Sequence, residues 1–404
     1  MKLKKKYAVA LAMVLAAAGA GTTVVLAPGA SAAAACAPAW SSSAVYVKDH
    51  SVSYQSKNYT AKWWTQGEVP TASGEWGVWA DKGACGGPTT PPTTPPTGPP
   101  TTPPTTPPTT GTKMAAAPYL YPGWGEPPAP ATVMEKTGIK AFTLAFVLAN
   151  GCNPVWDGEG GLTGGVHEST INAIKAAGGS VVPSIGGWSG NKLGPNCSTP
   201  EALAGAYQKV IDAFGLKAID IDIENTDEFE NYTVADRIVG ALKIVKQKNP
   251  TVKTILTFGT TPTGPNTHGI RLINQARALG ADVDIFAQMP FDFGGGADMY
   301  ASTVGASEGL KNQLKSTFGW TDAQAYSHMG ISGMNGLSDQ QELTSLDTWK
   351  SIKNYAKSKN FARFTFWAVN RDRSCPDGGV VANCSGIKQD APWEFTKVTA
   401  DFDK

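Results

Sequence analysis

The sequence has little charge. Only 17% of its 404 residues are Asp, Glu, Lys or Arg, and the formal net charge is +1. Four lysines at positions 2, 4, 5 and 6 lie in a segment that we expect to be removed, and without them the net charge is negative. Because no long run of Lys or Arg remains, the composition argues against nucleic acid as a partner.

Metal-ligand patterns are also missing. The sequence has four scattered histidines without the spacing of metal ligands, namely His50, His167, His268 and His328. The phosphate-binding pattern G-x-x-x-x-G-K-[ST] is absent. We therefore expect no histidine or cysteine metal site and no cofactor.

The first 32 residues have the organisation of a signal peptide. Met1–Lys6 is basic, Tyr7–Leu26 is apolar, and Ala30–Ala32 supplies the small residues of a cleavage site. A transmembrane anchor and a lipoprotein anchored at Cys36 are the alternatives. The apolar stretch is interrupted by glycine and threonine and has no charged flank after it, so we predict a secreted protein with no membrane partner.

Proline is concentrated in one place. Of 29 prolines, eleven fall between Pro88 and Pro108, in repeats of Thr-Thr-Pro-Pro. Proline fixes φ and removes backbone donors, so this segment is expected to be an extended spacer about 70 Å long. The predicted organisation is therefore a signal peptide at 1–32, a small module at 33–86, a linker at 87–113 and a large domain at 114–404.

The small module is rich in tryptophan and has short β-like segments. Adjacent Trp63 and Trp64 on a strand point to opposite faces, so one of them is expected at the surface unless loops cover both. An exposed flat aromatic ring suits the apolar face of a sugar. We therefore predict a small all-β carbohydrate-binding module.

The large domain alternates strand-like and helical patterns. Helical spacing is expected at Ala202–Phe214, Val234–Gln247, Ile270–Leu279 and Gln340–Lys357. Eight strand-like segments are expected at Ala117–Tyr121, Ala141–Leu148, Ser180–Ile185, Ala218–Ile223, Val252–Phe258, Val283–Met289, His328–Met334 and Arg363–Val369. This alternation predicts an α/β fold with a parallel sheet, either open and doubly wound or closed. The count of eight favours a (β/α)8 TIM barrel.

The segment Ala218–Glu224 carries the strongest chemical signal. Strand periodicity puts its three isoleucines on one face and Asp220, Asp222 and Glu224 on the other. In a barrel these carboxyl groups point inward, and at least one is expected to hold a proton and act as a general acid. A solvent-facing strand and a carboxylate Mg²⁺ or Ca²⁺ site are the alternatives.

The cysteines divide between the two folded parts. Two precede the proline-rich segment and four follow it, and in an exported chain they are expected to form disulfides. Each unit can close its own bridges. We predict Cys36–Cys85, Cys152–Cys197 and Cys375–Cys384.

Four motifs resemble glycoside hydrolase family 18, the retaining chitinases. Asp220-x-Asp222-x-Glu224 resembles the signature D-x-x-D-x-D-x-E, although Lys217 and Ala218 replace its first Asp and Gly. The other motifs are Ser184–Gly187, Gln288–Asp292 and Trp367. Tyr59–Gly67 is similar to the core of chitin-binding modules of carbohydrate-binding families 5 and 12, and Trp40 and Trp76 fit its flanks.

The resemblance implies substrate-assisted catalysis, in which the acetamido oxygen of the sugar attacks the anomeric carbon. Glu224 is then the general acid and base, Asp222 orients the acetamido group, and Asp220 tunes Asp222. Trp367 and Asp292 hold the sugar.

The same resemblance places Gln288 and Met289 along the sugar site. The family commonly has a tyrosine beside the aspartate that corresponds to Asp292, whereas this chain has phenylalanine on both sides. Tyr119 or Tyr121 could supply the missing hydroxyl.

We therefore expect a monomeric, secreted endochitinase that acts on chitin and chitin oligomers. Two alternatives stay open. One is a non-catalytic, lectin-like chitin-binding protein on the same scaffold, and the other is a relative that acts on protein glycans.

Overall fold

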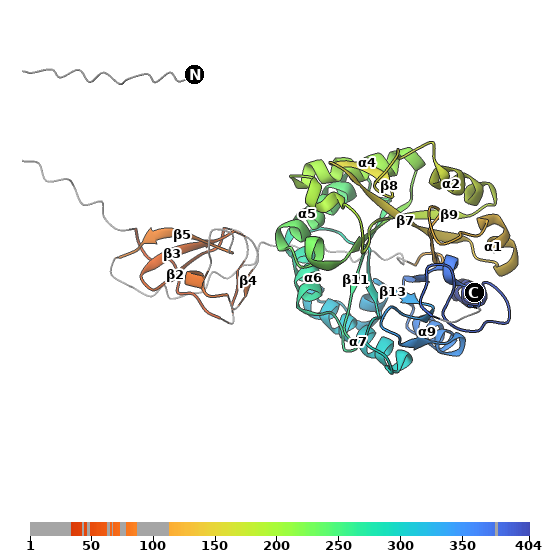
Figure 1. Cartoon of the computed structure of the whole chain (residues 1–404). Coiled ribbons are helices and arrows are strands. Elements are labelled where there is room, and N and C mark those ends of the chain that lie inside the picture. The colour runs from red at the N-terminus through yellow and green to blue at the C-terminus, as the bar shows by residue number, and fades with distance from the viewer. Residues whose placement is uncertain are drawn as a thin grey trace, which may run out of the picture. The chain divides into compact units, whose positions relative to one another are not determined.

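The structure, a computed structural model, describes residues 34–42, 44–46, 49–62, 65–66, 68–72, 78–86, 113–375 and 379–404. They belong to two compact units, one within Met1–Thr97 and the other within Gly98–Lys404 (Figure 1). The predicted signal peptide, nearly all of the predicted linker, and Trp63, Trp64 and Trp76 lie outside the described residues. The domain boundaries therefore stay a prediction.

The described part of the N-terminal unit is built of β-strands and one short 3-10 turn. β2 (Ser51–Tyr54), β3 (Lys57–Ala61) and β5 (Trp79–Ala84) form an antiparallel sheet. β1 (Val45–Tyr46) pairs with β4 (Thr65–Gln66), and the turn η1 spans Pro70–Ala72. A small core and the predicted Cys36–Cys85 disulfide stabilise a unit that has few apolar residues to bury.

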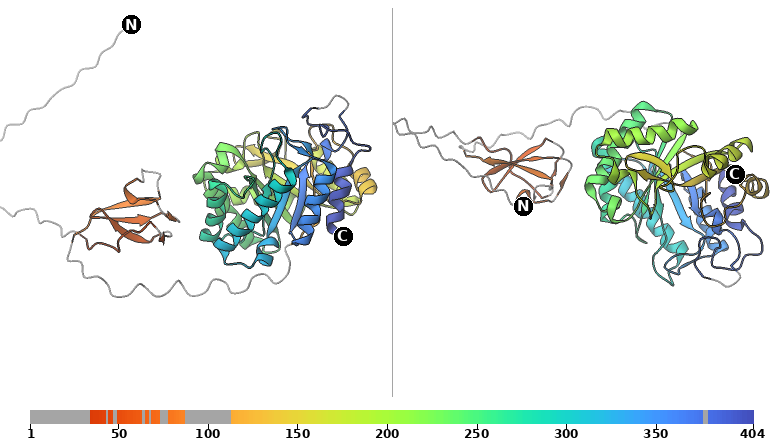
Figure 2. Two further views of the ribbon diagram at one scale, coloured as in Figure 1. Left: turned by 90° about the horizontal axis from the view of Figure 1, so that it is seen from below. Right: turned by 45° about the horizontal axis from the view of Figure 1, so that its top comes forward.

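The second unit contains a parallel barrel surrounded by helices (Figures 1 and 2). Within its described residues the parallel strands are, in sheet order, β6 (Tyr119–Leu120), β7 (Ala141–Asn150), β9 (Ser180–Gly186), β10 (Ala218–Ile223), β11 (Lys253–Gly259), β12 (Ile285–Met289), β13 (Met329–Met334) and β16 (Arg363–Trp367). β8 (Asn153–Trp156) pairs antiparallel with β7. All eight predicted strands are present, which confirms the α/β barrel.

A seam between the first and last strands closes the barrel. The Met114 N–H donates to the Ala362 carbonyl (2.8 Å), and the Ala117 N–H donates to the Phe364 carbonyl (3.2 Å). The Thr365 hydroxyl also donates to the Ala117 carbonyl (2.7 Å). These bonds join the segment before β6 to β16.

The helices cover the outside of the barrel. They are α1 (Pro130–Thr137), α2 (Val166–Ala176), α3 (Leu193–Asn196), α4 (Pro200–Phe214), α5 (Tyr232–Lys248), α6 (Thr267–Leu279), α7 (Met299–Phe318), α8 (Asp322–Tyr326), α9 (Leu346–Ser358) and α10 (Glu394–Ala400). α4 begins where the sequence predicts, because the Thr199 side chain accepts from the Ala202 N–H (3.2 Å) and proline occupies the first turn. Among the helices of the described residues, none combines the length and the apolarity needed to cross a membrane.

One helix prediction is wrong at its beginning. The pattern Gln340–Lys357 predicts a single helix, but α9 begins at Leu346, where the Ser345 hydroxyl caps the Thr348 N–H (3.1 Å). The preceding residues form a hairpin in which β14 (Gly336–Leu337) pairs with β15 (Leu343–Thr344). This hairpin contributes to the site described below.

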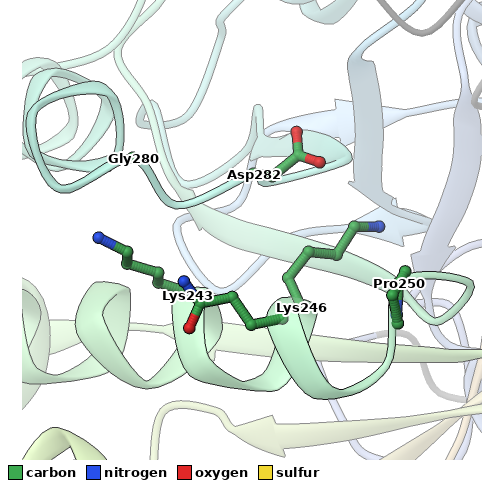
Figure 3. Close-up of a pocket in the computed structure, with 6 residues that line it drawn as sticks. Lys243, Lys246, Pro250, Gly280 and Asp282 are labelled. Carbon is green, nitrogen blue, oxygen red and sulfur yellow. The ribbon is translucent and has the colours of Figure 1, made fainter. Parts of the chain in front are cut away.

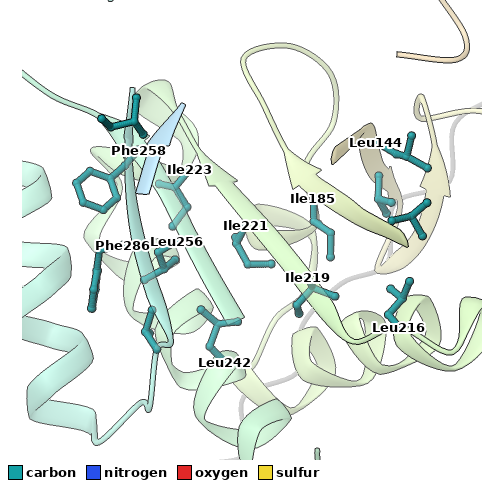
Figure 4. Packing of buried hydrophobic residues seen from close by; sticks show 14 of the residues in the cluster. Leu144, Ile185, Leu216, Ile219, Ile221, Ile223, Leu242, Leu256, Phe258 and Phe286 are labelled. Carbon is teal, nitrogen blue, oxygen red and sulfur yellow. The ribbon is translucent and has the colours of Figure 1, made fainter. Parts of the chain in front are cut away.

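Strand β10 divides its side chains between two environments. Ile219, Ile221 and Ile223 are buried in the large core between the barrel and its helices (Figure 4). Full burial of each isoleucine contributes about 1.5–3 kcal/mol. Ala218 faces the other way, in a small apolar cluster with Ile255 and Ile285, so the alternate residues of β10 face the barrel interior.

Two disulfides brace loops of the barrel unit. Cys152, after β7, pairs with Cys197, after α3, and Cys375 pairs with Cys384. All three predicted bridges are confirmed.

Candidate active site

Asp220 lies at the base of the site and is fully buried. Its carboxylate accepts hydrogen bonds from the Tyr119 hydroxyl (2.8 Å), the Ser184 hydroxyl (2.7 Å) and the Thr257 hydroxyl (2.6 Å). These donors come from β6, β9 and β11. Three strands besides its own therefore fix one inward carboxylate.

Asp222 lies one inward position further along β10. Its Oδ2 is 3.5 Å from the Tyr119 hydroxyl, and its Oδ1 has no hydrogen-bond partner among the described residues. Burial raises the pKa of Asp222 well above its usual range, and the charges of Glu224 and Asp220 raise it further. The low-dielectric interior thus favours a protonated Asp222.

Glu224 follows the last residue of β10, at the carboxyl end of the barrel. It precedes the π-helical turn η2 (Asn225–Phe229) as its N-cap residue. Burial raises the pKa of Glu224 to about 7, a change that Lys192 opposes and that Asp292 and Asp339 reinforce. A carboxyl group with this pKa can donate a proton near neutral pH and accept one afterwards.

The glycines of the Ser184–Gly187 motif have a steric role. A Cβ at Gly186 would lie 2.2 Å from the Asp222 carbonyl oxygen, and the φ of Gly186 is +117°. The Gly187 N–H donates to the same carbonyl (2.9 Å). Glycine therefore lets β9 approach the strand that carries the carboxyl groups, while Ser184 binds Asp220.

A group of aromatic side chains lies around the end of β16. The Trp367 ring stacks on Phe146 with centroids 5.5 Å apart at 12°, and it makes edge contacts with Tyr119 (5.7 Å) and Tyr121 (6.2 Å). Tyr119 links this group to Asp220 and Asp222 through its hydroxyl. The predicted aromatic platform is thus connected to the carboxyl groups by one side chain.

Asp292 is held by the β14–β15 hairpin. Its backbone N–H donates to the Glu342 carboxylate, as does the Phe293 N–H (3.2 Å), and its own carboxylate accepts from the Gln340 N–H (3.3 Å). Burial, followed by the charge of Asp339, raises the pKa of Asp292. The charge of Asp292 in turn raises the pKa of Glu224.

Gln288 does not line the site, and this part of the prediction is wrong. Its fully buried side-chain amide is hydrogen-bonded to the Ser307 hydroxyl of α7 (2.6 Å). Its neighbours in register, Phe258 and Ile331, lie in the outer core. Gln288 therefore faces the helices, and Met289, the next residue, takes the inward face.

Neither candidate for the missing tyrosine hydroxyl is free. The Tyr119 hydroxyl donates to Asp220, and the ring is buried. The Tyr121 side chain interacts electrostatically with Asp157, and burial together with that carboxylate raises the pKa of its hydroxyl. Tyr119 and Tyr121 therefore pack against Trp367, and the hydroxyl of each already interacts with a carboxylate.

Sequence patterns missed several charged residues around Glu224 and Asp292. They are Lys192, Glu228, Asp339 and Glu342, which come from three separate loops or turns. Burial raises the pKa of Glu228 to about 8. In the described residues, no group of three or more His, Cys, Asp or Glu side chains is arranged to hold a metal ion.

A hollow on the outside of the barrel lies away from these residues (Figure 3). It is lined by Lys243, Lys246, Gln247, Pro250, Gly280 and Asp282. Pro250 precedes β11 and Asp282 precedes β12, so the hollow lies at the amino end of the strands. Glu224 is at the opposite end.

Comparisons with known proteins agree with both units. The model of carbohydrate-binding module family 5/12 matches residues 39–80. A probable bifunctional chitinase/lysozyme of Escherichia coli K12 is 27% identical over 390 residues, which is 91% of this chain and 42% of that protein. Endochitinase 11 of Metarhizium anisopliae is 25% identical over 352 residues, which is 83% of this chain and 64% of that protein.

The chain thus spans less than two thirds of each of these relatives. Among solved structures, the catalytic domain of a hyperthermophilic chitinase from Pyrococcus furiosus superposes with a TM-score of 0.66 at 27% identity, covering 72% of this chain and 96% of that one. These matches confirm the resemblance to chitinases predicted from the motifs, and they support a carbohydrate-binding module of family 5/12 N-terminal to a TIM barrel.

Proposed function

We propose that this protein is a secreted chitinase that hydrolyses β-1,4-linked N-acetylglucosamine polymers by a retaining, substrate-assisted mechanism. The observation that carries the proposal is the row of carboxyl groups along β10 and directly after its last residue. Asp220 is held by three hydroxyls, Asp222 is buried with a raised pKa, and Glu224 has a pKa of about 7 at the barrel rim. Relatives named as chitinases support the substrate class.

The chemistry follows from these environments. Glu224 donates its proton to the glycosidic oxygen while the acetamido oxygen of the substrate attacks the anomeric carbon. Asp222 orients that acetamido group as positive charge develops on it, and Asp220 holds Asp222 in place through Tyr119. The attack forms a cyclic intermediate in which the acetamido oxygen is bonded to the anomeric carbon. Water then displaces that oxygen, and Glu224 recovers its proton from the water.

The sugar is positioned by groups on other strands. Trp367 offers a partly buried aromatic face at the end of β16, and the Asp292 carboxylate lies on the loop after β12. Met289 faces inward at the end of β12. An aromatic platform packs against the apolar face of a pyranose, while the carboxylate binds its hydroxyls.

A lectin-like, non-catalytic function is the second candidate. It is favoured by Phe291 and Phe293, which lack a hydroxyl, and by the engaged hydroxyls of Tyr119 and Tyr121. Reducing-end release from colloidal chitin separates the two candidates. We expect release by the intact chain, and binding without release would overturn the chitinase proposal.

Secretion is part of the proposal. The basic and apolar leader, three disulfides and a module that binds an insoluble polysaccharide all fit a protein that works outside the cell. Chitin is too large to be taken up, so the enzyme must reach it there.

Removal of an aromatic side chain from the module is expected to affect insoluble chitin and to spare short soluble oligomers. Trp63→Ala or Trp64→Ala should weaken binding to insoluble chitin and slow its hydrolysis, because the module raises the local concentration of the barrel on the solid. Hydrolysis of short soluble oligomers should stay nearly unchanged. Pull-down on chitin beads and parallel assays on the two substrates measure this. Equal losses on both substrates would contradict it.

A further inference from the structure

A lysine is buried against the turn that follows the proposed general acid. Lys192 is 2% exposed and precedes α3, in the loop that follows β9. Its ammonium group donates to the Trp188 carbonyl (3.1 Å) and to both carboxylate oxygens of Asp227 (3.2 Å each). Lysine is rarely buried without a partner, and Asp227 supplies the opposite charge.

Asp227 belongs to the turn that begins at Glu224. It lies in η2, three residues after Glu224, and its side chain is 41% exposed. The Trp188 carbonyl, which accepts from Lys192, also accepts from the Asn225 side-chain amide (2.7 Å). The ion pair and this shared carbonyl together tie the loop after β9 to the residue that follows Glu224.

We propose that the Lys192–Asp227 ion pair is a positioning element that sets the pH range in which Glu224 acts as general acid and base. This inference rests on the proposed function of the site. It concerns neither the sugar contacts nor the nucleophile, and it assigns a role to two side chains that lie outside the motifs.

Several charged groups act electrostatically on Glu224. Asp292 and Asp339 favour its protonated form, as does burial itself, and Lys192 opposes them. Glu224 is in turn one of the charges that raise the pKa of Asp222 and of Glu228. Lys192 is thus the cation that keeps the Glu224 pKa near neutral.

Both steps of the proposed reaction, proton donation by Glu224 and its later recovery of a proton, need a Glu224 pKa near neutral. A carboxyl group with a much higher pKa would donate poorly to the leaving oxygen, and one with a much lower pKa would be ionised before the sugar is bound. Asp227 offsets part of the lysine charge. The two members of the pair therefore shift the Glu224 pKa in opposite directions. Lys192 lowers this pKa, and Asp227 raises it.

The test compares two variants that change opposite charges. Lys192→Met removes the cation, so the Glu224 pKa rises and the alkaline limb of the kcat/KM profile moves to higher pH by about one unit. Asp227→Asn leaves Lys192 without its offsetting charge, so the same limb moves to lower pH. The substrate is a soluble chromogenic N-acetylglucosamine oligomer, which keeps adsorption to solid chitin out of the measurement.

A surface ion pair provides matched controls. Lys350 and Asp347 form an exposed i,i+3 pair on α9 (2.9 Å). Lys350→Met and Asp347→Asn make the same chemical changes away from Glu224, and we expect no shift of the limb for either. Near-UV circular dichroism of each variant checks that the fold is retained.

The outcomes are distinguishable. If the unaltered chain releases no reducing ends, the proposed function itself fails. If it is active and the two site variants leave the limb in place, or move it in the same direction, the ion pair has a structural role only and the inference is overturned. If Lys192→Met does not fold, the partly exposed Asp227→Asn decides alone, and only a shift to lower pH supports the inference.

Discussion

Replacement of Glu224 by Gln is expected to lower kcat by at least about 10²–10⁴-fold, the usual contribution of general acid catalysis. The amide keeps the shape of the side chain but cannot supply the proton that the leaving oxygen needs. Chitin-oligomer binding should persist, because Trp367 and Asp292 are unchanged. Steady-state kinetics on a soluble oligomer and calorimetric binding measure the two effects separately.

A matched control is available on the surface. Glu201 is exposed in the first turn of α4, and Glu201→Gln should leave kcat and binding unchanged. If Glu224→Gln retains activity, Glu228 becomes the alternative acid, since its pKa is also raised, to about 8. The structure favours Glu224, because Glu228 is buried against Gly194, whereas Glu224 is partly exposed at the barrel rim.

A fully deacetylated glucosamine oligomer is expected to remain intact even with the unaltered protein, and so is cellulose. In the proposed mechanism the nucleophile is the acetamido oxygen of the substrate, which neither polymer provides. The protein carboxyls are poor substitutes, because Asp220 is engaged by three hydroxyls and the raised pKa of Asp222 favours its neutral form. Mass spectrometry of the products, with an N-acetylated oligomer of equal length as control, measures cleavage.

Two results would exclude this mechanism. One is brisk cleavage of either polymer. The other is a covalent sugar adduct found by peptide mapping on Asp220, Asp222 or Asp292. Each would mean that a carboxylate of the protein is the nucleophile.

Strand periodicity in the sequence predicted most of the fold and the three carboxyl groups at the centre of the site. The alternation of isoleucine and carboxyl side chains along β10 has one arrangement in a helix-covered parallel barrel, with the apolar face outward. That arrangement is what the structure has, from Ala218 at the base to Glu224 at the rim. The three disulfides followed from the same topology, since each pair lies in one unit or in neighbouring loops.

Local sequence patterns could not predict the charged residues that surround Glu224. Lys192 and Asp227 are 35 residues apart, and nothing in either segment indicates that a lysine is buried there. Glu342 fell inside a predicted helix because Gln340–Ser345 has no glycine or proline to interrupt the pattern. Gln288 is different: it is adjacent to Met289, so periodicity alone shows that the two cannot both face inward.

Because of the barrel seam, the barrel can close only late in the synthesis of the chain. Translation produces Met114 and Ala117 first, but their hydrogen-bond acceptors at Ala362 and Phe364 emerge some 250 residues later. Trp367 follows on the same strand. A nascent chain that stops before β16 therefore lacks both the closing hydrogen bonds and the aromatic face of the proposed site, so the proposed site is complete only when this last strand joins the sheet.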